Sequence, residues 1–207
     1  MTIAVLFPGQ GSQFLGMGRE FIDSDSDCAA IMEMAASVCD FPLEQLCQDG
    51  PMEELTRAVH LQPAITVTNL ICYQGLKKAW GDKLSPACFA GHSLGEYSAL
   101  CAAGALSVED TIRLVTRRGA LMEREGQQNP GGMRAVLGMT MEEVEGVIAQ
   151  CAGAGIVTAA NHNTETQIVI SGDIAGLDAV QEKAADAGAR VIPLAVSVAN
   201  HSPLVAD

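Results

Sequence analysis

The stretch FAGHSLGEYSAL, residues 89–100, places Ser93 between Gly91 and Gly95 in the pattern G-x-S-x-G. The apolar run PACFAG leading into it predicts a short strand, and the small residues after it predict a helix packed closely on a sheet. Strand, tight turn and helix in that order are the setting in which a serine nucleophile is presented at a helix N-terminus. The stretch therefore predicts an α/β fold and makes Ser93 a candidate nucleophile.

The rest of the first half is predicted to be one buried strand followed by helices. Residues 3–7, IAVLF, read as the strand and end in the turn PGQG. Helical apolar spacing is present at residues 28–39, 51–59 and 63–80, the last of which begins with a proline. A further helix is expected from Ser107, because Ser107-V-E-D resembles a capping box.

The second half has a different order of elements. Residues 126–132, GQQNPGG, form a breaker cluster that we interpret as a domain boundary. The following segments predict strand, helix, strand, strand, helix and strand, the last strand being RVIPLAV at 190–196. This βαββαβ order is typical of a ferredoxin-like fold, so residues 127–196 are predicted to be an inserted small domain. Residues 1–126 plus 197–207 would then form the α/β core.

Composition limits the kinds of partner that the protein can have. The chain has 207 residues and a net charge of −13, which disfavours binding to nucleic acid or to an anionic membrane. The seven cysteines include no C-x-x-C pair, which indicates reduced thiols and no metal site. With neither a signal peptide nor a long apolar stretch, we expect a cytoplasmic location and no contact with a membrane.

A serine nucleophile needs a base, and His201 is the histidine that we select. The segment VSVANHSPL places it after the expected strand at 190–196, before a Ser-Pro pair that reads as the start of a helix. Catalytic sites of α/β proteins assemble at the carboxyl ends of strands. The alternative is an exposed loop histidine without a role in catalysis.

Arg118 stands out within the helix that begins near Ser107. Helical spacing aligns it with the apolar stripe Ile112, Leu114, Val115, Leu121 and Met122. A guanidinium on a core-facing stripe is costly unless an anion pairs with it. The pattern is compatible with a buried ion pair to Asp or Glu, or with a clamp for a substrate carboxylate, which suits the planar fork of arginine.

The glycine-rich loop FPGQGSQFLGMG, residues 7–18, was compared with a dinucleotide-binding fingerprint. The pattern G-x-G-x-x-G would require glycine at position 14, where this chain has Phe14. We therefore reject nucleotide binding by this loop.

Taken together, FPGQGSQ, GHSLGEYSAL, RRG at 117–119, VISG at 169–172 and NHSPL resemble a known family over the whole chain. It is that of the malonyl-CoA:acyl carrier protein transacylases of fatty acid synthesis and the acyltransferase domains of polyketide synthases. The resemblance implies a hydrolase-like parallel-sheet core with an inserted ferredoxin-like domain, in agreement with the βαββαβ order.

The resemblance also implies roles for individual residues. Ser93 would be acylated, His201 would be its base, and Arg118 would bind the malonyl carboxylate. Backbone N–H groups of Gln10 and Leu94 would form the oxyanion hole. Malonyl-CoA and acyl carrier protein would be the partners, and no cofactor or metal is expected beyond the coenzyme A thioester that serves as substrate.

This chain departs from the family in two respects. Asn200 stands before the histidine where the family usually has Phe, or Ser in methylmalonyl-selective domains, so we expect Asn200 to contact the substrate and leave acyl selectivity open. Family chains also continue well past this histidine, which leads us to expect a C-terminal truncation at Asp207. A serine esterase or thioesterase, and a non-catalytic acyl-carrier docking fragment, are the alternative functions.

Overall fold

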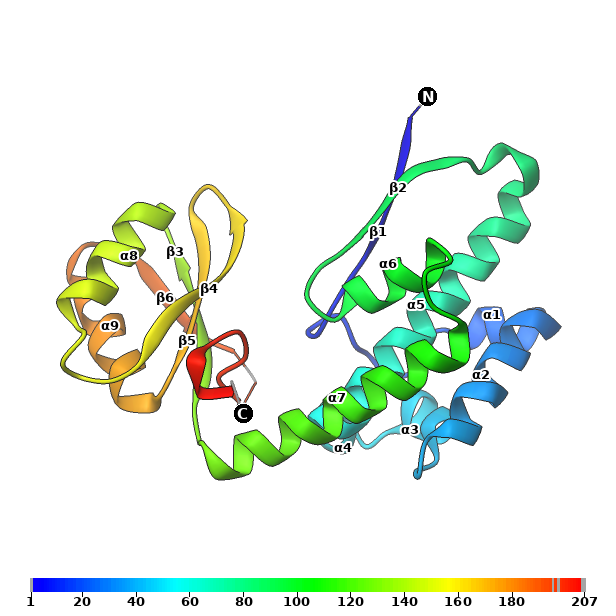
Figure 1. Cartoon of the computed structure of the whole chain (residues 1–207), viewed down its shortest axis with the longest axis horizontal. Helices are drawn as coiled ribbons and strands as arrows, with labels where there is room; N and C mark the ends of the chain where they lie inside the picture. Colours follow the sequence, from blue (N-terminus) through cyan, green and yellow to red (C-terminus); the bar gives the residue numbers. More distant parts are fainter. Residues whose placement is uncertain (1, 195, 197, 206–207) are drawn as a thin grey trace. The chain divides into compact units, whose positions relative to one another are not determined.

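The computed structural model describes residues 2–194, 196 and 198–205. It divides after Leu121 into two compact units, which are described one at a time. Figure 1 shows the elements of both. The division falls within α7 (Val108–Gln128), so this helix contributes residues to each unit.

The first unit combines a small parallel sheet with a set of helices. Its strands β1 (Ile3–Phe7) and β2 (Pro86–Gly91) pair in parallel, with Phe7 opposite Gly91. Strands were predicted in both places, and these predictions are confirmed. The helices are α1 (Arg19–Ser24), α2 (Ser26–Val38), α3 (Leu43–Asp49), α4 (Met52–Thr56), α5 (Ala58–Trp80), η1 (Gly81–Lys83), α6 (Gly95–Ala102) and α7. In Figure 1, α6 lies beside the strand pair, and α5 packs against α6.

The long helix α5 corrects the prediction of a helix that begins at Pro63. It begins at Ala58, and Pro63 lies inside it. Proline lacks the N–H that would bond to the carbonyl four residues earlier, so the loss is one backbone hydrogen bond near the helix start. The flanking residues Leu61 and Ile65 are 0% and 2% exposed. Their burial outweighs that loss, because fully burying a large aliphatic side chain stabilises by about 1.5–3 kcal/mol.

The core of the first unit is formed where α2, α3, α5 and α7 meet. Its buried members on these helices include Met32, Leu43, Val67, Ile71 and Ile112. Gly119 of α7 permits the close approach of α7 to the start of α5, because a Cβ at this position would lie 2.6 Å from the Ala58 carbonyl oxygen. This contact fixes the position of α7 along the axis of α5.

The start of α7 is as predicted, whereas its end and its apolar stripe are not. The Ser107 hydroxyl accepts a hydrogen bond from the Asp110 N–H at 3.0 Å, as a cap should. The helix then continues through Gly126 to Gln128, into the predicted breaker cluster. A helical glycine costs only about 1 kcal/mol relative to Ala, so the helix persists until it approaches Pro130. Leu114, expected in the buried stripe, is 46% exposed.

The second unit has the predicted βαββαβ order. Its elements are β3 (Gly132–Leu137), α8 (Met141–Gln150), β4 (Val157–Thr164), β5 (Gln167–Gly172), α9 (Ile174–Asp186) and β6 (Arg190–Pro193). A short 3-10 turn, η2 (Pro203–Val205), follows. The four strands form one antiparallel sheet in the order β4-β5-β3-β6. The predicted last strand was too long: β6 ends at Pro193, which has no N–H to extend the ladder, and position 195 lies outside the described residues.

Both faces of this small sheet are covered. Helices α8 and α9 pack on one face over Val136, Ile168 and Ile170. On the other face Met133 and Ala135 are buried, and Val196, after β6, packs against them. The central strand β3 therefore has two buried faces, which explains its continuous run of buried residues.

The cysteines keep free thiols at all seven positions. Burial raises the pKa of the Cys47 thiol to about 12, so it remains protonated and unreactive near neutral pH. Among the described residues, no helix is long and apolar enough to span a membrane.

The Gly119 contact predicts opposite effects of one substitution at two sites. Gly119→Ala should lower the free energy of unfolding by about 1–3 kcal/mol, because the new methyl overpacks against backbone. Gly146→Ala in α8, where nothing lies within 4 Å, should instead raise it by about 0.5–1 kcal/mol. Denaturant-dependent hydrogen exchange in the helix that carries each substitution measures both values. A stabilising Gly119→Ala would contradict the close contact.

Candidate active site

The turn between β2 and α6 has no room for side chains at its two glycines. A Cβ at Gly91 would lie 2.0 Å from the Gly95 carbonyl carbon, and a Cβ at Gly95 would lie 2.2 Å from the Phe7 carbonyl oxygen. Between them Ser93 has a positive φ of 48°, a conformation that non-glycine residues rarely adopt. Strain of this kind is typical of a serine held at a strand-to-helix elbow.

The loop after β1 lies directly against this elbow. A Cβ at Gly9 would be 2.3 Å from the His92 carbonyl oxygen and 3.5 Å from the Leu94 nitrogen. The loop is closed on itself by Ser12, whose hydroxyl donates to the Gly9 carbonyl oxygen at 2.8 Å. Gln10 therefore occupies a tight turn next to the residues that follow β2.

Two backbone N–H groups beside Ser93 are available to bind an anion. Those of Gln10 and Leu94 donate to no acceptor within the described part of the chain. Leu94 is the residue before α6, where the N–H groups have no intrahelical acceptor and the helix dipole favours negative charge. This arrangement is compatible with the predicted oxyanion hole.

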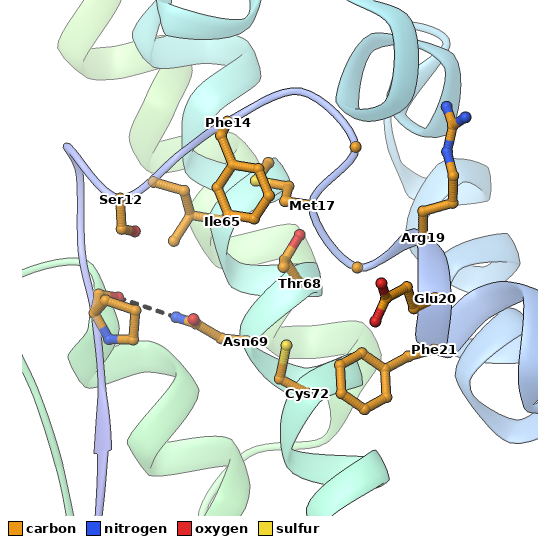
Figure 2. A pocket seen from close by; sticks show the side chains of 13 residues that line it. Ser12, Phe14, Met17, Arg19, Glu20, Phe21, Ile65, Thr68, Asn69 and Cys72 are labelled. Atoms are coloured by element: carbon orange, nitrogen blue, oxygen red, sulfur yellow. Dashed lines mark hydrogen bonds between the residues drawn. The ribbon is translucent and has the colours of Figure 1, made fainter.

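The long helix α5 fastens the loop and the elbow together. The Asn69 amide donates to the Pro8 carbonyl oxygen at 3.0 Å (Figure 2) and to the Ser98 hydroxyl at 3.1 Å. Asn69 is only 6% exposed, so both hydrogen bonds are shielded from water. One side chain of α5 thus links the residue after β1 to α6.

Arg118 is half-buried and has no acidic partner among the described residues. Its Nη1 donates to the Gln62 Oε1, and its guanidinium lies 5.8 Å from the centre of the Tyr97 ring. Burial lowers the pKa of Arg118, and the nearby Tyr97 and Glu96 oppose that shift. Arg118 therefore forms no buried ion pair within the described residues, and its role as a carboxylate clamp stays a prediction. The arginines at 113, 117 and 124 are exposed, as predicted.

The contact with Tyr97 places the Arg118 guanidinium close to the helix that begins at the elbow. Tyr97 lies on α6, one turn after Ser93, and packs against the buried cluster formed by Leu61, Ile65, Leu94 and Val115. Leu94 and Val115 are both fully buried. The packing of α6 on α7 therefore holds Arg118 near the residue that follows the nucleophile.

The second unit carries His201 and Asn200. His201 also has a positive φ, 59°, and precedes Ser202, whose hydroxyl accepts a hydrogen bond from the Leu204 N–H at 3.2 Å. This cap matches the predicted helix start, although the turn is 3-10. The prediction that His201 stands at the carboxyl end of a strand is wrong, because β6 ends at Pro193.

The structure thus gathers four of the six predicted site residues. Gln10, Ser93, Leu94 and Arg118 belong to the first unit, and Asn200 and His201 belong to the second. The pairing of Ser93 with His201 stays a prediction, as does a contact between Asn200 and the substrate.

The sequence analysis missed the residues of α5 that support this site. Gln62 and Asn69 lie seven positions apart, with Thr66 between them, and all three are buried. Residues at i, i+4 and i+7 share one helix face. A row of polar side chains on an otherwise apolar helix was the available signal, but the helix had been predicted to begin after Gln62.

A cavity of about 400 Å³ is lined by the loop after β1, the start of α1 and one face of α5. Figure 2 shows the rings of Phe14 and Phe21 beside it, with Thr68, Asn69 and Cys72 on α5. Gln10, Ser93 and Arg118 do not line the cavity, so it is distinct from the candidate site.

A serine on a strained strand-to-helix elbow, with free backbone donors beside it, is the arrangement that defines α/β proteins with a serine nucleophile. The comparisons with known proteins make this class specific. Residues 5–207 match the family model described as acyl transferase domain, and the chain belongs to this family.

Relatives within the family carry a narrower name. The chain is 41% identical over 205 residues to a malonyl CoA-acyl carrier protein transacylase of Bacillus subtilis, covering 98% of this chain and 64% of the relative. It is similar to the structure of a malonyl-CoA:acyl carrier protein transacylase from Xanthomonas oryzae, with a TM-score of 0.91, 40% identity and 99% and 66% coverage. Another similar structure is described as a type II PKS acyl-carrier protein in complex with its malonyl-transacylase, with 35% identity, a TM-score of 0.91 and 99% and 66% coverage.

The chain thus spans about two thirds of the length of the relatives that it matches. For the Bacillus subtilis relative the share is slightly less than two thirds. Its mixed α/β architecture, with a small parallel sheet and a four-stranded antiparallel sheet, matches those structures.

The link through Asn69 can be tested by two substitutions one residue apart. Asn69→Leu should lower the free energy of unfolding by about 1–3 kcal/mol and speed hydrogen exchange in residues 8–12, because the Pro8 carbonyl and Ser98 hydroxyl lose a buried donor. Thr68→Val is the control, since the Thr68 hydroxyl donates only to its own helix at Ala64. Equal exchange rates in the two variants would show that Asn69 does not hold the loop.

Proposed function

We propose that the protein transfers a malonyl group from coenzyme A to the phosphopantetheine thiol of acyl carrier protein, through an acyl ester on Ser93. The observation that carries the proposal is Arg118, a half-buried guanidinium that bonds to neutral Gln62 and has no carboxylate partner among the described residues. A partly buried cation is stabilised when an anionic ligand forms an ion pair with it. A free carboxylate on the acyl group supplies that anion and fits the arginine fork.

The chemistry assigns one step to each side chain. His201 takes the proton from the Ser93 hydroxyl, and the oxygen attacks the thioester carbonyl carbon. The tetrahedral intermediate collapses, the carbon–sulfur bond breaks, and the coenzyme A thiol leaves with the proton from His201. The thiol of the carrier then attacks the ester in the same way, and Ser93 recovers its proton.

The oxyanion of both intermediates would be bound by the Gln10 and Leu94 N–H groups. Their lack of acceptors within the described part of the chain supports this assignment, since preorganised donors need no rearrangement when charge develops. Loss of one such donor costs about 10²- to 10³-fold in rate in serine enzymes.

The whole chain fits this function as a two-domain enzyme. We assign residues 1–126 plus 197–207 to a hydrolase-like core and residues 127–196 to an inserted ferredoxin-like domain. The element order supports the inserted domain, whereas residues 198–205 group with the second unit and do not support their assignment to the core. The complex with an acyl-carrier protein in a similar structure supports the choice of carrier. Free thiols at every cysteine agree with a cytoplasmic location.

The covalent intermediate gives the most direct test. Incubation of the chain with malonyl-CoA should add one malonyl mass, mapped to Ser93 by peptide analysis, and Ser93→Ala should take no label. Loss of the label in water without an acceptor thiol would favour a thioesterase. Absence of any label would favour a docking fragment without catalytic activity.

The role of Arg118 predicts a change in acyl preference. Arg118→Ala should slow labelling by malonyl-CoA about 10- to 100-fold, the value of a charge-assisted pair, while labelling by uncharged acetyl-CoA is retained or improved. Gln62→Leu should act in the same direction to a smaller extent, because it removes the side chain that holds the guanidinium. The control is Arg117→Ala on the exposed side of α7. Equal losses for both acyl groups would mean that Arg118 acts only in folding.

A further inference from the structure

The backbone around His201 is held against the first residues of β3 by contacts within the second unit. Val198 and Ala199 are 6% and 0% exposed, although they belong to a loop. A Cβ on Gly131 would lie 2.8 Å from the Ala199 methyl, so this glycine leaves just enough room for Ala199. The loop is therefore packed like core.

Asn200 makes a second contact with the same strand. Its Nδ2 donates to the Sδ of Met133 at 3.8 Å, within the range of a hydrogen bond to sulfur. Met133 is 7% exposed and lies on the sheet face opposite α8 and α9. The side chain that the family comparison would direct at the acyl group is thus engaged by the protein itself.

The turn that contains His201 is closed by a third contact. The Ser202 hydroxyl donates to the Ala199 carbonyl oxygen at 2.7 Å, and the Asn200 N–H donates to the Val198 carbonyl oxygen at 2.9 Å. These contacts surround His201, whose backbone is left-handed with a φ of 59°. Such a conformation costs about 1–3 kcal/mol and persists only where neighbouring contacts determine it.

We propose that Asn200 is a positioning residue: together with Gly131, Met133, Ala199 and Ser202 it forms a clasp that fixes the His201 backbone, and hence the place of the imidazole. The inference rests on the proposed function in giving His201 the role of base. It differs from the expectation that residue 200 selects the acyl group, because the Asn200 amide is directed to Met133 and acts through its neighbour.

Substitutions at both ends of the contact test the clasp. Met133→Leu removes the sulfur acceptor at nearly constant volume, and Asn200→Leu removes the donor. Each should lower the maximal rate of Ser93 acylation about threefold to tenfold, the value of one hydrogen bond, with unchanged half-saturating malonyl-CoA. Both variants should slow malonyl-CoA and methylmalonyl-CoA equally, and the double variant should be no slower than either. Met139→Leu, on the buried side of the helices, is the matched control.

An NMR readout tests the clasp without catalysis. The imidazole signal of His201 should shift in Met133→Leu and in Asn200→Leu, and should stay in place in Met139→Leu. The proposal is overturned if Asn200→Leu changes the ratio of malonyl to methylmalonyl labelling while Met133→Leu behaves like the control. It is also overturned if neither substitution moves the His201 signal. An unsubstituted chain that takes no label would contradict the proposed function alone, and the imidazole signal would then decide the clasp.

Discussion

The first unit depends on the contact between the Gly95 backbone and the end of β1. Because a Cβ on Gly95 would stand 2.2 Å from the Phe7 carbonyl oxygen, only glycine lets α6 start this close to the strand. Next to this close approach Ser93 has a left-handed conformation, and the Leu94 N–H has no acceptor among the described residues. The positions of the candidate nucleophile and of the candidate oxyanion donor are thus both linked to one steric constraint.

Helix α5 connects the elbow with the other candidate site residues of the first unit. Its buried face is interrupted by a polar row in which Asn69 holds the loop after β1 and Gln62 holds Arg118. Most buried polar groups have a hydrogen-bond partner, whereas the Gln62 Nε2 has none among the described residues. A stability penalty of this kind is common where a side chain is kept for its function.

The two units support their catalytic candidates by the same physical means. Ser93 and His201 both have positive φ angles, and both are held by close backbone packing at a glycine, Gly95 in one unit and Gly131 in the other. A strained residue keeps its conformation only where its surroundings are more rigid than itself. The sheet against which the neighbours of each residue pack provides that rigidity, as expected for groups that must be placed to within a fraction of an ångström.

The sequence by itself determined the elements whose signal is local. Gly91, Ser93 and Gly95 specify the elbow because the turn has no room for a Cβ at the two glycine positions. The alternation of strand and helix patterns specifies the βαββαβ order of the second unit. The tertiary structure decided what local patterns do not contain. Pro63 lies inside a helix because packing of Leu61 and Ile65 outweighs one lost hydrogen bond. Leu114 is exposed and Arg118 bonds to Gln62 because the partners of α7 come from α5, more than 50 residues earlier in the chain. Helical spacing defines a face, but only the three-dimensional packing decides which neighbour that face meets.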